Sequence, residues 1–197
     1  MRLHSTGITR FVDHRLPETP ARWAIIASWN RCSHLCADAP APFHRVADAE
    51  LARRLERNAA LVEAASPRLR TLLRHFPARC SVAYVTDADG VVLAADGDAE
   101  HLRLFCLMPG YDWSEARMGT NGAGTCLIAG RPMVVAGREH LLRALEERTC
   151  IAAPIRHADG RIAGALDLSS PAPHGRDQRL EQVTEAALEI ESQLRRS

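Results

Sequence analysis

The sequence predicts an α+β fold, in which one central antiparallel sheet of about six strands is flanked by helices. Apolar residues recur at helical spacing near both ends of the chain, whereas its middle alternates short runs of β-forming residues with turns. Two of these turns, Asp87-Ala-Asp-Gly90 and His157-Ala-Asp-Gly160, have the composition of hairpin connections. Hairpins pair their strands antiparallel, so the helices are expected to cover the sheet.

Composition excludes several classes of function. The 197 residues are 46% hydrophobic and carry a net charge of +1, which is typical of a globular domain and demands neither nucleic acid nor an anionic membrane as partner. All 25 basic residues are arginine, so mechanisms that need a lysine, such as Schiff-base chemistry or a phosphate-loop lysine, are excluded. No apolar run is long enough to cross a bilayer and no signal segment is apparent. We therefore expect a cytoplasmic protein with no membrane contact and with reduced cysteines.

Four regions are expected along the chain. Residues 1–20 form a flexible arm, 21–78 an N-terminal helical region, 79–172 the core that carries the sheet, and 173–197 a C-terminal helix. The helical region is an extension to the sheet domain.

Helical periodicity defines the elements of the first region. The first helix begins at Arg22 and places four residues on one face: Ile25, Trp29, Cys32 and Cys36. A longer helix is expected from about Val46 to about Phe76, with an interruption at Pro67.

The middle of the chain supplies the strands. The expected strands are Ser81–Thr86, Val91–Ala95, Met133–Ala136, Cys150–Ile155 and Ile162–Leu168. Helices are expected over Ala99–Met108 and Glu139–Glu147.

The last helix, Gln178–Arg196, carries an apolar seam whose steps alternate between three and four residues. The seam consists of Leu180, Val183, Ala187, Ile190 and Leu194. Such a narrow stripe needs a partner: it either covers the sheet or forms a dimer bundle, and the heptad spacing makes a parallel homodimer the default hypothesis.

The segment Trp113–Thr125 contains three glycines and leads into a short helix. Its glycines allow close approach to a ligand, and Thr120 or Asn121 is suited to cap the helix, leaving its amides pointed into a pocket. Trp113 would wall such a pocket and Glu115 would accept hydrogen bonds from a ligand hydroxyl. The alternative is structural: Trp113 fills the core and Asn121 satisfies backbone groups.

The same segment carries a family resemblance. Trp113-Ser-Glu115 and Gly119-Thr-Asn-x-x-Gly-Thr125 resemble the GAF sensor domain of bacterial sigma-54-dependent activators of the acetoin- and dihydroxyacetone-regulator type. Further stretches match in order: Ser28-Trp-Asn-Arg-Cys32, Thr86-Asp-Ala-Asp-Gly90, Glu139-His140, Cys150-Ile-Ala-Ala-Pro-Ile155 and Leu166-Asp-Leu-Ser169.

The resemblance implies a GAF-like fold and a sensory function. A small-molecule effector, or a partner protein, would occupy a cavity beside the segment, and the output would be control of transcription. The candidate ligand-binding residues are Trp113, Glu115, Thr120, Asn121, Thr125, Glu139, His140 and Cys150. His140 has the alternative of donating to a backbone carbonyl. The ATPase (AAA+) and helix-turn-helix modules of such activators are absent from the 197 residues, so a sigma-54 activator module is expected in cis or in trans.

Other chemistries fit the sequence less well. The resemblance also implies an alternative, since some stand-alone GAF proteins are enzymes that reduce free methionine sulfoxide with pocket cysteines. Of Cys106, Cys126 and Cys150, two would have to approach the same cavity for this chain to be such a thiol enzyme. A ligand-independent interaction module is a second alternative. Cys32 and Cys36, with His34 and His44 nearby, lack the spacing of structural zinc sites. We therefore expect no metal, no cofactor and no catalytic residue.

DNA binding by this chain is not expected either. The arginines of the long helix alternate with glutamates, as on a solvated helix face, and no base-reading motif accompanies them.

Overall fold

The computed structural model describes residues 20–76, 80–171 and 176–196. Apart from its last residue, the predicted arm at 1–20 lies outside the described residues, so its flexibility stays a prediction. None of the helices in the described part of the chain combines the length and the hydrophobicity needed to cross a bilayer.

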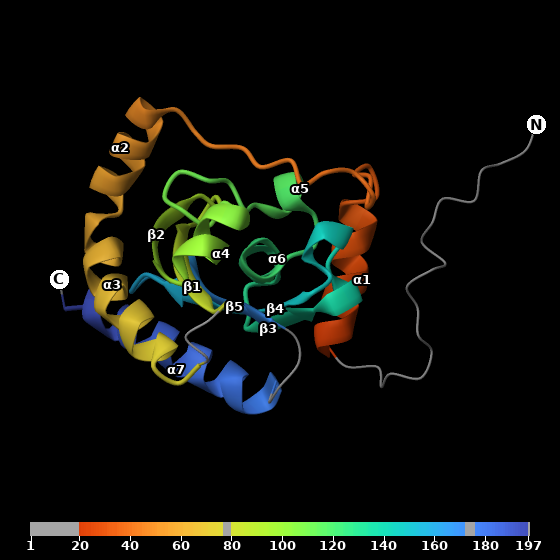
Figure 1. Cartoon of the computed structure of the whole chain (residues 1–197). Coiled ribbons are helices and arrows are strands. Elements are labelled where there is room, and N and C mark those ends of the chain that lie inside the picture. The colour runs from red at the N-terminus through yellow and green to blue at the C-terminus, as the bar shows by residue number, and fades with distance from the viewer. Residues whose placement is uncertain (1–19, 77–79, 172–175, 197) are drawn as a thin grey trace, which may run out of the picture.

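A single antiparallel sheet forms the centre of the molecule (Figure 1). Its five strands are β1 (Val82–Asp87), β2 (Val92–Gly97), β3 (Met133–Ala136), β4 (Arg148–Arg156) and β5 (Ile162–Pro171). They lie in the order β2-β1-β5-β4-β3, and every neighbouring pair is antiparallel. The α+β prediction is confirmed, with five strands in the described residues where about six were expected. The chain around Tyr111 and Asp112 makes only isolated bridges, because Gly110 has a left-handed backbone (φ +93°) that interrupts an extended run.

Seven helices of the described residues surround this sheet. They are α1 (Pro20–Arg31), α2 (Asp48–Arg57), α3 (Ala59–Leu73), α4 (Ala99–Leu104), α5 (Glu115–Met118), α6 (Gly122–Ala129) and α7 (Arg176–Leu194). Figure 1 shows α3 and α7 on one face of the sheet, with α1, α4, α5 and α6 on the other side. Two apolar cores result, one on each face.

The predicted long helix is in fact two helices, and the break lies at Asn58 rather than at Pro67. Asn58 leaves the helical conformation (φ −109°, ψ 22°), and its side-chain amide donates to the Arg54 carbonyl at 2.8 Å, which ends α2. Pro67 lies inside α3, which continues to Leu73. The interruption predicted at Pro67 was therefore wrong.

Two further predicted helices are shorter than expected. The first ends at Arg31, so Cys36 lies beyond it and is exposed instead of sharing its buried face. The helix predicted to reach Met108 ends at Leu104, because Cys106 has a left-handed backbone (φ 50°).

The helix expected over Glu139–Glu147 is replaced by two short 3₁₀ turns, Gly137–Glu139 and Arg143–Leu145. His140 between them is extended (φ −62°, ψ 140°), so a continuous helix cannot form.

The seam of α7 packs inside the chain. Val183, Ala187 and Ile190 are at most 1% exposed and belong to the apolar core shared with α3 and the sheet, and Leu180 and Leu194 pack against that core. The stripe predicted to form a homodimer therefore has its partner within the same molecule. A dimer through this seam would require these side chains to leave the core.

Candidate functional site

The Trp113–Thr125 segment forms α5 and the first turn of α6, joined through Gly119. Asn121 caps α6, since its Oδ1 accepts from the Gly124 amide at 2.9 Å while its Nδ2 donates to the Gly119 carbonyl at 2.8 Å. The capping role predicted for this residue is confirmed. Both polar ends of Asn121 are engaged by backbone, and the side chain is fully buried.

Trp113 is part of the apolar core on this face. Its ring lies 6.1 Å from that of Phe43 and 6.2 Å from that of Tyr84, and its Nε1 donates to the Cys106 carbonyl at 3.1 Å. The side chain is 2% exposed. Trp113 thus fills the core, as the structural alternative expected, and its ring also packs near Tyr84 of β1.

Three of the predicted binding residues converge on one serine of α1. Ser28 Oγ donates to Glu115 Oε2 at 2.7 Å and shares hydrogen bonds with the hydroxyls of Thr120, at 2.7 Å, and Thr125, at 3.4 Å. All four side chains are buried. We call these residues the Ser28 node. The node fastens α1 to α5 and α6.

An ion pair strengthens this junction. Arg31, in the last turn of α1, donates from Nε to Glu115 Oε1 at 2.7 Å and from Nη2 to Oε2 at 3.1 Å. Cys32 adds a weaker contact to the Glu115 carbonyl at 3.6 Å. The Ser28-to-Cys32 motif and the Trp113-to-Glu115 motif therefore meet in space although more than 80 residues separate them.

A different buried polar group lies on the sheet, beneath the start of α6. Asp167, on β5, is fully buried, and neither carboxyl oxygen has a hydrogen-bond partner among the described residues. Gly122 lies directly above it: a Cβ at this position would collide with Asp167 Oδ2 and approach Cys150 Cβ to 2.6 Å. Only glycine therefore fits where α6 begins over the sheet.

Tyr84 faces Asp167 across the pairing of β1 with β5. Its hydroxyl is likewise buried and has no hydrogen-bond partner in the part of the chain that the structure describes. Burial raises the pKa of Asp167 to about 8, although Tyr84, Arg148 and the Ala123 amide act in the opposite direction. Asp167 is thus a neutral acid near pH 7, able both to donate and to accept.

His140 and Cys150 form a buried pair on the same side of the sheet. His140 Nδ1 lies 3.0 Å from the Gly137 carbonyl, which can only accept, so Nδ1 carries the proton and Nε2 faces Cys150 Sγ at 3.4 Å. Burial lowers the pKa of His140 to about 4 and raises that of Cys150 to about 12. Both are neutral, and Cys150 Sγ also lies 3.6 Å from Ser169 Oγ.

Glu139 serves the backbone. Its carboxylate accepts from the Ala136 amide at 2.8 Å, and its carbonyl accepts from Trp29 Nε1 at 2.9 Å. Glu139 therefore stabilises the turn that places His140 in the core.

The three buried cysteines, Cys32, Cys126 and Cys150, do not have the character of nucleophiles. Burial raises the pKa of Cys126 far above its usual value and that of Cys32 to about 11, and Cys150 is raised as described above. A thiolate is the reactive form, so these thiols are poorly suited to redox catalysis. Cys32 is buried at the end of α1 whereas Cys36 is exposed, so the two do not form a metal-binding face.

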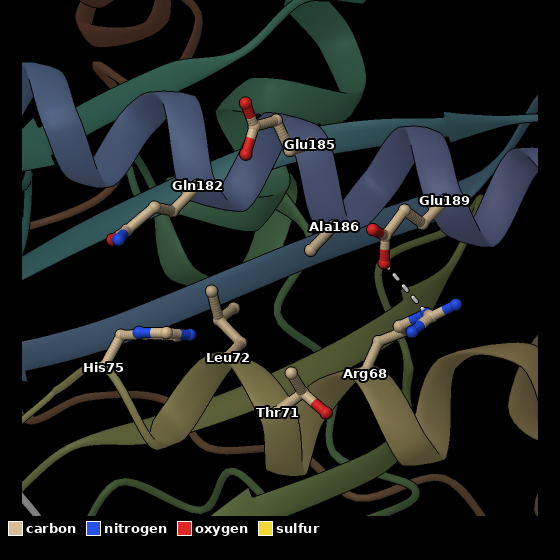
Figure 2. A pocket seen from close by; sticks show the side chains of 8 residues that line it. All are labelled: Arg68, Thr71, Leu72, His75, Gln182, Glu185, Ala186 and Glu189. Atoms are coloured by element: carbon tan, nitrogen blue, oxygen red, sulfur yellow. Dashed lines mark ion pairs between the residues drawn. The ribbon is translucent and has the colours of Figure 1, made fainter.

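A surface groove lies on the opposite face of the sheet, between α3 and α7 (Figure 2). It encloses about 260 Å³ and is bridged by an ion pair between Arg68 and Glu189 at 3.1 Å. Its other lining residues are Thr71, Leu72, His75, Gln182, Glu185 and Ala186. None of the predicted binding residues lines this groove.

Of the eight predicted residues, Trp113 fills the apolar core and Asn121 and Glu139 bond to backbone groups, while the other five divide into two groups. Glu115, Thr120 and Thr125 face α1, whereas Cys150 and His140 lie at the sheet. Sequence reasoning did not select Ser28, Arg31, Tyr84 or Asp167 as site residues. The signal was present for three of them, since they stand in the stretches Ser28-Trp-Asn-Arg-Cys32 and Leu166-Asp-Leu-Ser169.

Comparison with known proteins identifies the family. The model of the MimR N-terminal domain matches residues 15–189. The chain belongs to the MimR N-terminal domain family. Relatives of this family domain include the acetoin dehydrogenase operon transcriptional activator AcoR of Bacillus subtilis, which is 33% identical over 94% of this chain and 32% of that protein. The propane 2-monooxygenase operon transcriptional activator MimR of Mycolicibacterium smegmatis is 36% identical over 68% of this chain and 24% of that protein.

The chain therefore spans about a third or less of these activators. Among solved structures, the Escherichia coli DhaR(N)–DhaL complex matches with a TM-score of 0.81 at 21% identity, over 88% of this chain and 61% of that chain. The GAF-like fold and the resemblance to the acetoin- and dihydroxyacetone-regulator type are confirmed. The reduced form of fRMsr from Staphylococcus aureus matches less well, with a TM-score of 0.50 at 20% identity over 71% of this chain and 92% of that chain.

Proposed function

We propose that this chain is an effector-sensing domain that controls transcription. Its relatives are transcriptional activators, and the family domain has a GAF-like fold in this chain. The output would pass to a sigma-54-type activator module with its AAA+ ATPase, in cis or in trans, in the cytoplasm. No direct DNA contact by this chain is proposed, since arginines of α2 such as Arg53 and Arg54 are paired with Glu50.

The effector would bind where α6 begins over the sheet, against Asp167 and Tyr84. One observation carries this assignment: two buried polar side chains face each other there, and neither has a hydrogen-bond partner among the described residues. A buried polar group without a partner costs roughly 1–3 kcal/mol, and a ligand that supplies the missing hydrogen bonds recovers this free energy.

The chemistry of the site favours a small neutral effector with a hydroxyl or carbonyl group. A protonated Asp167 donates and accepts, and Tyr84 does the same, so both match an alcohol, ketone or ketol. Apolar side chains also stand beside the site: Ala152 pairs with Asp167 across β4 and β5, and Trp113 lies near Tyr84. By analogy with activators named for acetoin dehydrogenase and propane 2-monooxygenase operons, we propose short alcohols, diols and ketols as the class.

Occupancy would be transmitted through α6 to α1. Gly122 touches Asp167 and Cys150, so a ligand at Asp167 has to displace the start of α6 from the sheet. The other side of this segment is fastened to α1 by the Ser28 node. A shift of α6 would therefore change how α1 docks, which is a population shift between two helix arrangements.

A thermal-shift and calorimetry screen of the chain with acetoin, propan-2-ol, acetone and short diols tests the proposal. We expect at least one of them to bind saturably, and Asp167→Leu to weaken binding roughly tenfold or more, since it removes the hydrogen-bonding group. Asp159→Leu, in the exposed turn between β4 and β5, is the matched control and should bind as the parent chain does.

Two results would contradict it. A flat response to every compound by a folded chain would favour the ligand-independent interaction module. Turnover of free methionine sulfoxide that disappears in Cys150→Ser would favour the thiol enzyme.

A further inference from the structure

Three potential metal ligands meet at the open end of the β1–β2 hairpin, away from the predicted sensor residues. Cys80 lies two residues before the start of β1, Asp98 directly follows β2, and His101 lies in the first turn of α4. One donor atom from each, the thiol sulfur, a carboxylate oxygen and an imidazole nitrogen, lies within 4.8 Å of the other two. All three residues are partly exposed, so the cluster is accessible from solvent.

We propose that Cys80, Asp98 and His101 form a binding site for a transition-metal ion of the Zn²⁺ class. Sulfur, imidazole nitrogen and carboxylate oxygen together are a donor set that Zn²⁺ accepts in tetrahedral geometry, with water as the fourth ligand. Three protein ligands with one open position is the arrangement of an exchangeable rather than a closed structural site.

The backbone at Cys80 supports this assignment independently of the donor distances. Cys80 adopts a left-handed conformation (φ 67°), which non-glycine residues rarely occupy. Two side chains hold it there: the Cys80 amide donates to Asp98 Oδ2 at 3.0 Å, and Arg148 Nη2 donates to the Cys80 carbonyl at 2.8 Å. Two hydrogen bonds therefore hold the backbone of Cys80 in this strained conformation, which places its thiol near the other two donors.

The other two donors are also held in place. Asp98 caps α4, with Oδ1 accepting from the amides of Glu100 and His101, and this fixes the carboxylate beside the helix. His101 Nδ1 lies 3.2 Å from the same oxygen, and its ring packs against Phe105 at 5.8 Å between centroids. Asp98 Oδ2 accepts one hydrogen bond, from Cys80, and so retains a lone pair for a cation.

An ion here would tie the start of β1 to α4. Cys80 lies where the chain enters the sheet after the helical region. Asp98 is the N-cap of α4, and His101 lies within α4. The site is separate from Asp167 and Tyr84, so its test is independent of the effector proposal.

Titration of the chelator-treated, reduced full chain with Co²⁺ and Zn²⁺ tests the site. We expect about one Co²⁺ per chain with a thiolate-to-cobalt charge-transfer band, and displacement of that band by Zn²⁺. Cys80→Ser should abolish the band, and His101→Gln should weaken affinity at least about tenfold. Cys36→Ser, which removes an exposed cysteine near His34, is the matched control and should leave both unchanged.

A second measurement uses the unmodified chain, so that its result does not depend on whether the variants fold. Zn²⁺ should slow alkylation of Cys80, followed by mass spectrometry of its peptide, and should leave alkylation of Cys36 unaltered. Absence of a cobalt band, a band lost in Cys36→Ser but kept in Cys80→Ser, or equal protection of both cysteines would overturn the proposal.

Discussion

The two faces of the sheet are built from the same strands and differ in what they carry. On the face covered by α3 and α7, the strands contribute apolar side chains such as Val85, Ile151, Leu166 and Leu168. On the face covered by α1, α5 and α6, the same strands contribute Tyr84, Cys150 and Asp167 among apolar neighbours. One face is a framework sealed by α7, and the other holds buried polar groups that can exchange partners.

This difference separates a face that supports stability from the face to which we assign the proposed sensing. Close apolar packing has one good arrangement, because any shift opens voids that lose contacts. A polar layer such as the Ser28 node can re-pair its donors and acceptors when a helix moves. The difference predicts that substitutions on the first face change the free energy of unfolding most, whereas those on the second change how α1 and α6 dock.

Substitution of Leu168 by alanine should give the largest loss of stability. Leu168 is fully buried on the face toward α3 and α7, so its loss removes apolar burial and leaves a cavity. We expect about 2–5 kcal/mol less stability in urea unfolding. Leu188→Ala, at an α7 position that is 53% exposed, should stay within about 0.5 kcal/mol. Similar effects at both positions would contradict the framework role of this face.

Substitution of Glu115 by glutamine should have an intermediate effect, confined to the junction of α1. The change removes the charge that pairs with Arg31 and accepts from Ser28, while it preserves size. We expect a loss of roughly 1–3 kcal/mol. Faster hydrogen exchange of α1 amides should accompany it, with α3 and α7 unchanged.

A second arginine–glutamate pair provides the control for that experiment. Arg68 and Glu189 link α3 to α7 at the surface, with side chains 36% and 57% exposed, so Glu189→Gln should cost less than about 1 kcal/mol. If Glu189→Gln loosened α1 as much as Glu115→Gln does, the Ser28 node would not be the fastening of α1.

The same contrast explains what the sequence could predict. Runs of β-forming residues bounded by turns located all five strands within a few residues, because strands covered on both faces of a sheet are short and almost continuously apolar. The break at Asn58 escaped prediction because it depends on a side-chain hydrogen bond to Arg54, whereas Pro67 gave the more visible signal. The dimer seam of α7 was read correctly as apolar, but periodicity does not reveal whether the partner lies in the same chain.

The candidate site was predictable only as a neighbourhood. The glycine-rich motif located α6 and its cap, since capping is a local interaction. Which polar residues face each other depends on long-range packing: Ser28 meets Thr120 across 92 positions, and Tyr84 meets Asp167 through strand register. An aspartate inside an apolar strand was the available signal for Asp167, because a buried carboxyl in such a position is seldom idle.

The smallest expected effect, and the one most specific to the second face, is the pH dependence contributed by Asp167. Its pKa is raised to about 8 by burial, against about 3.9 for an unfolded aspartate, so the folded chain binds one more proton than the unfolded chain between these values. Stability therefore falls as pH rises through this window and levels off above pH 8. His140 has the opposite sign, since its lowered pKa of about 4 makes stability fall as pH drops below its unfolded value of about 6.5.

The contributions of Asp167 and His140 to the free energy of unfolding can be told apart between pH 6.5 and 8. In this interval Asp167 titrates in the folded chain, whereas His140 stays neutral. The groups around Asp167 that could confuse the signal, Tyr84, Cys126 and Cys150, have raised pKa values and remain protonated there. We expect the parent chain to lose roughly 1–2 kcal/mol over this interval and Asp167→Asn, which cannot titrate, to lose much less. Urea unfolding at several pH values measures the difference between the two slopes. Parallel slopes would mean that Asp167 is ionised in the folded chain, and the effector class would then shift from neutral molecules to cations.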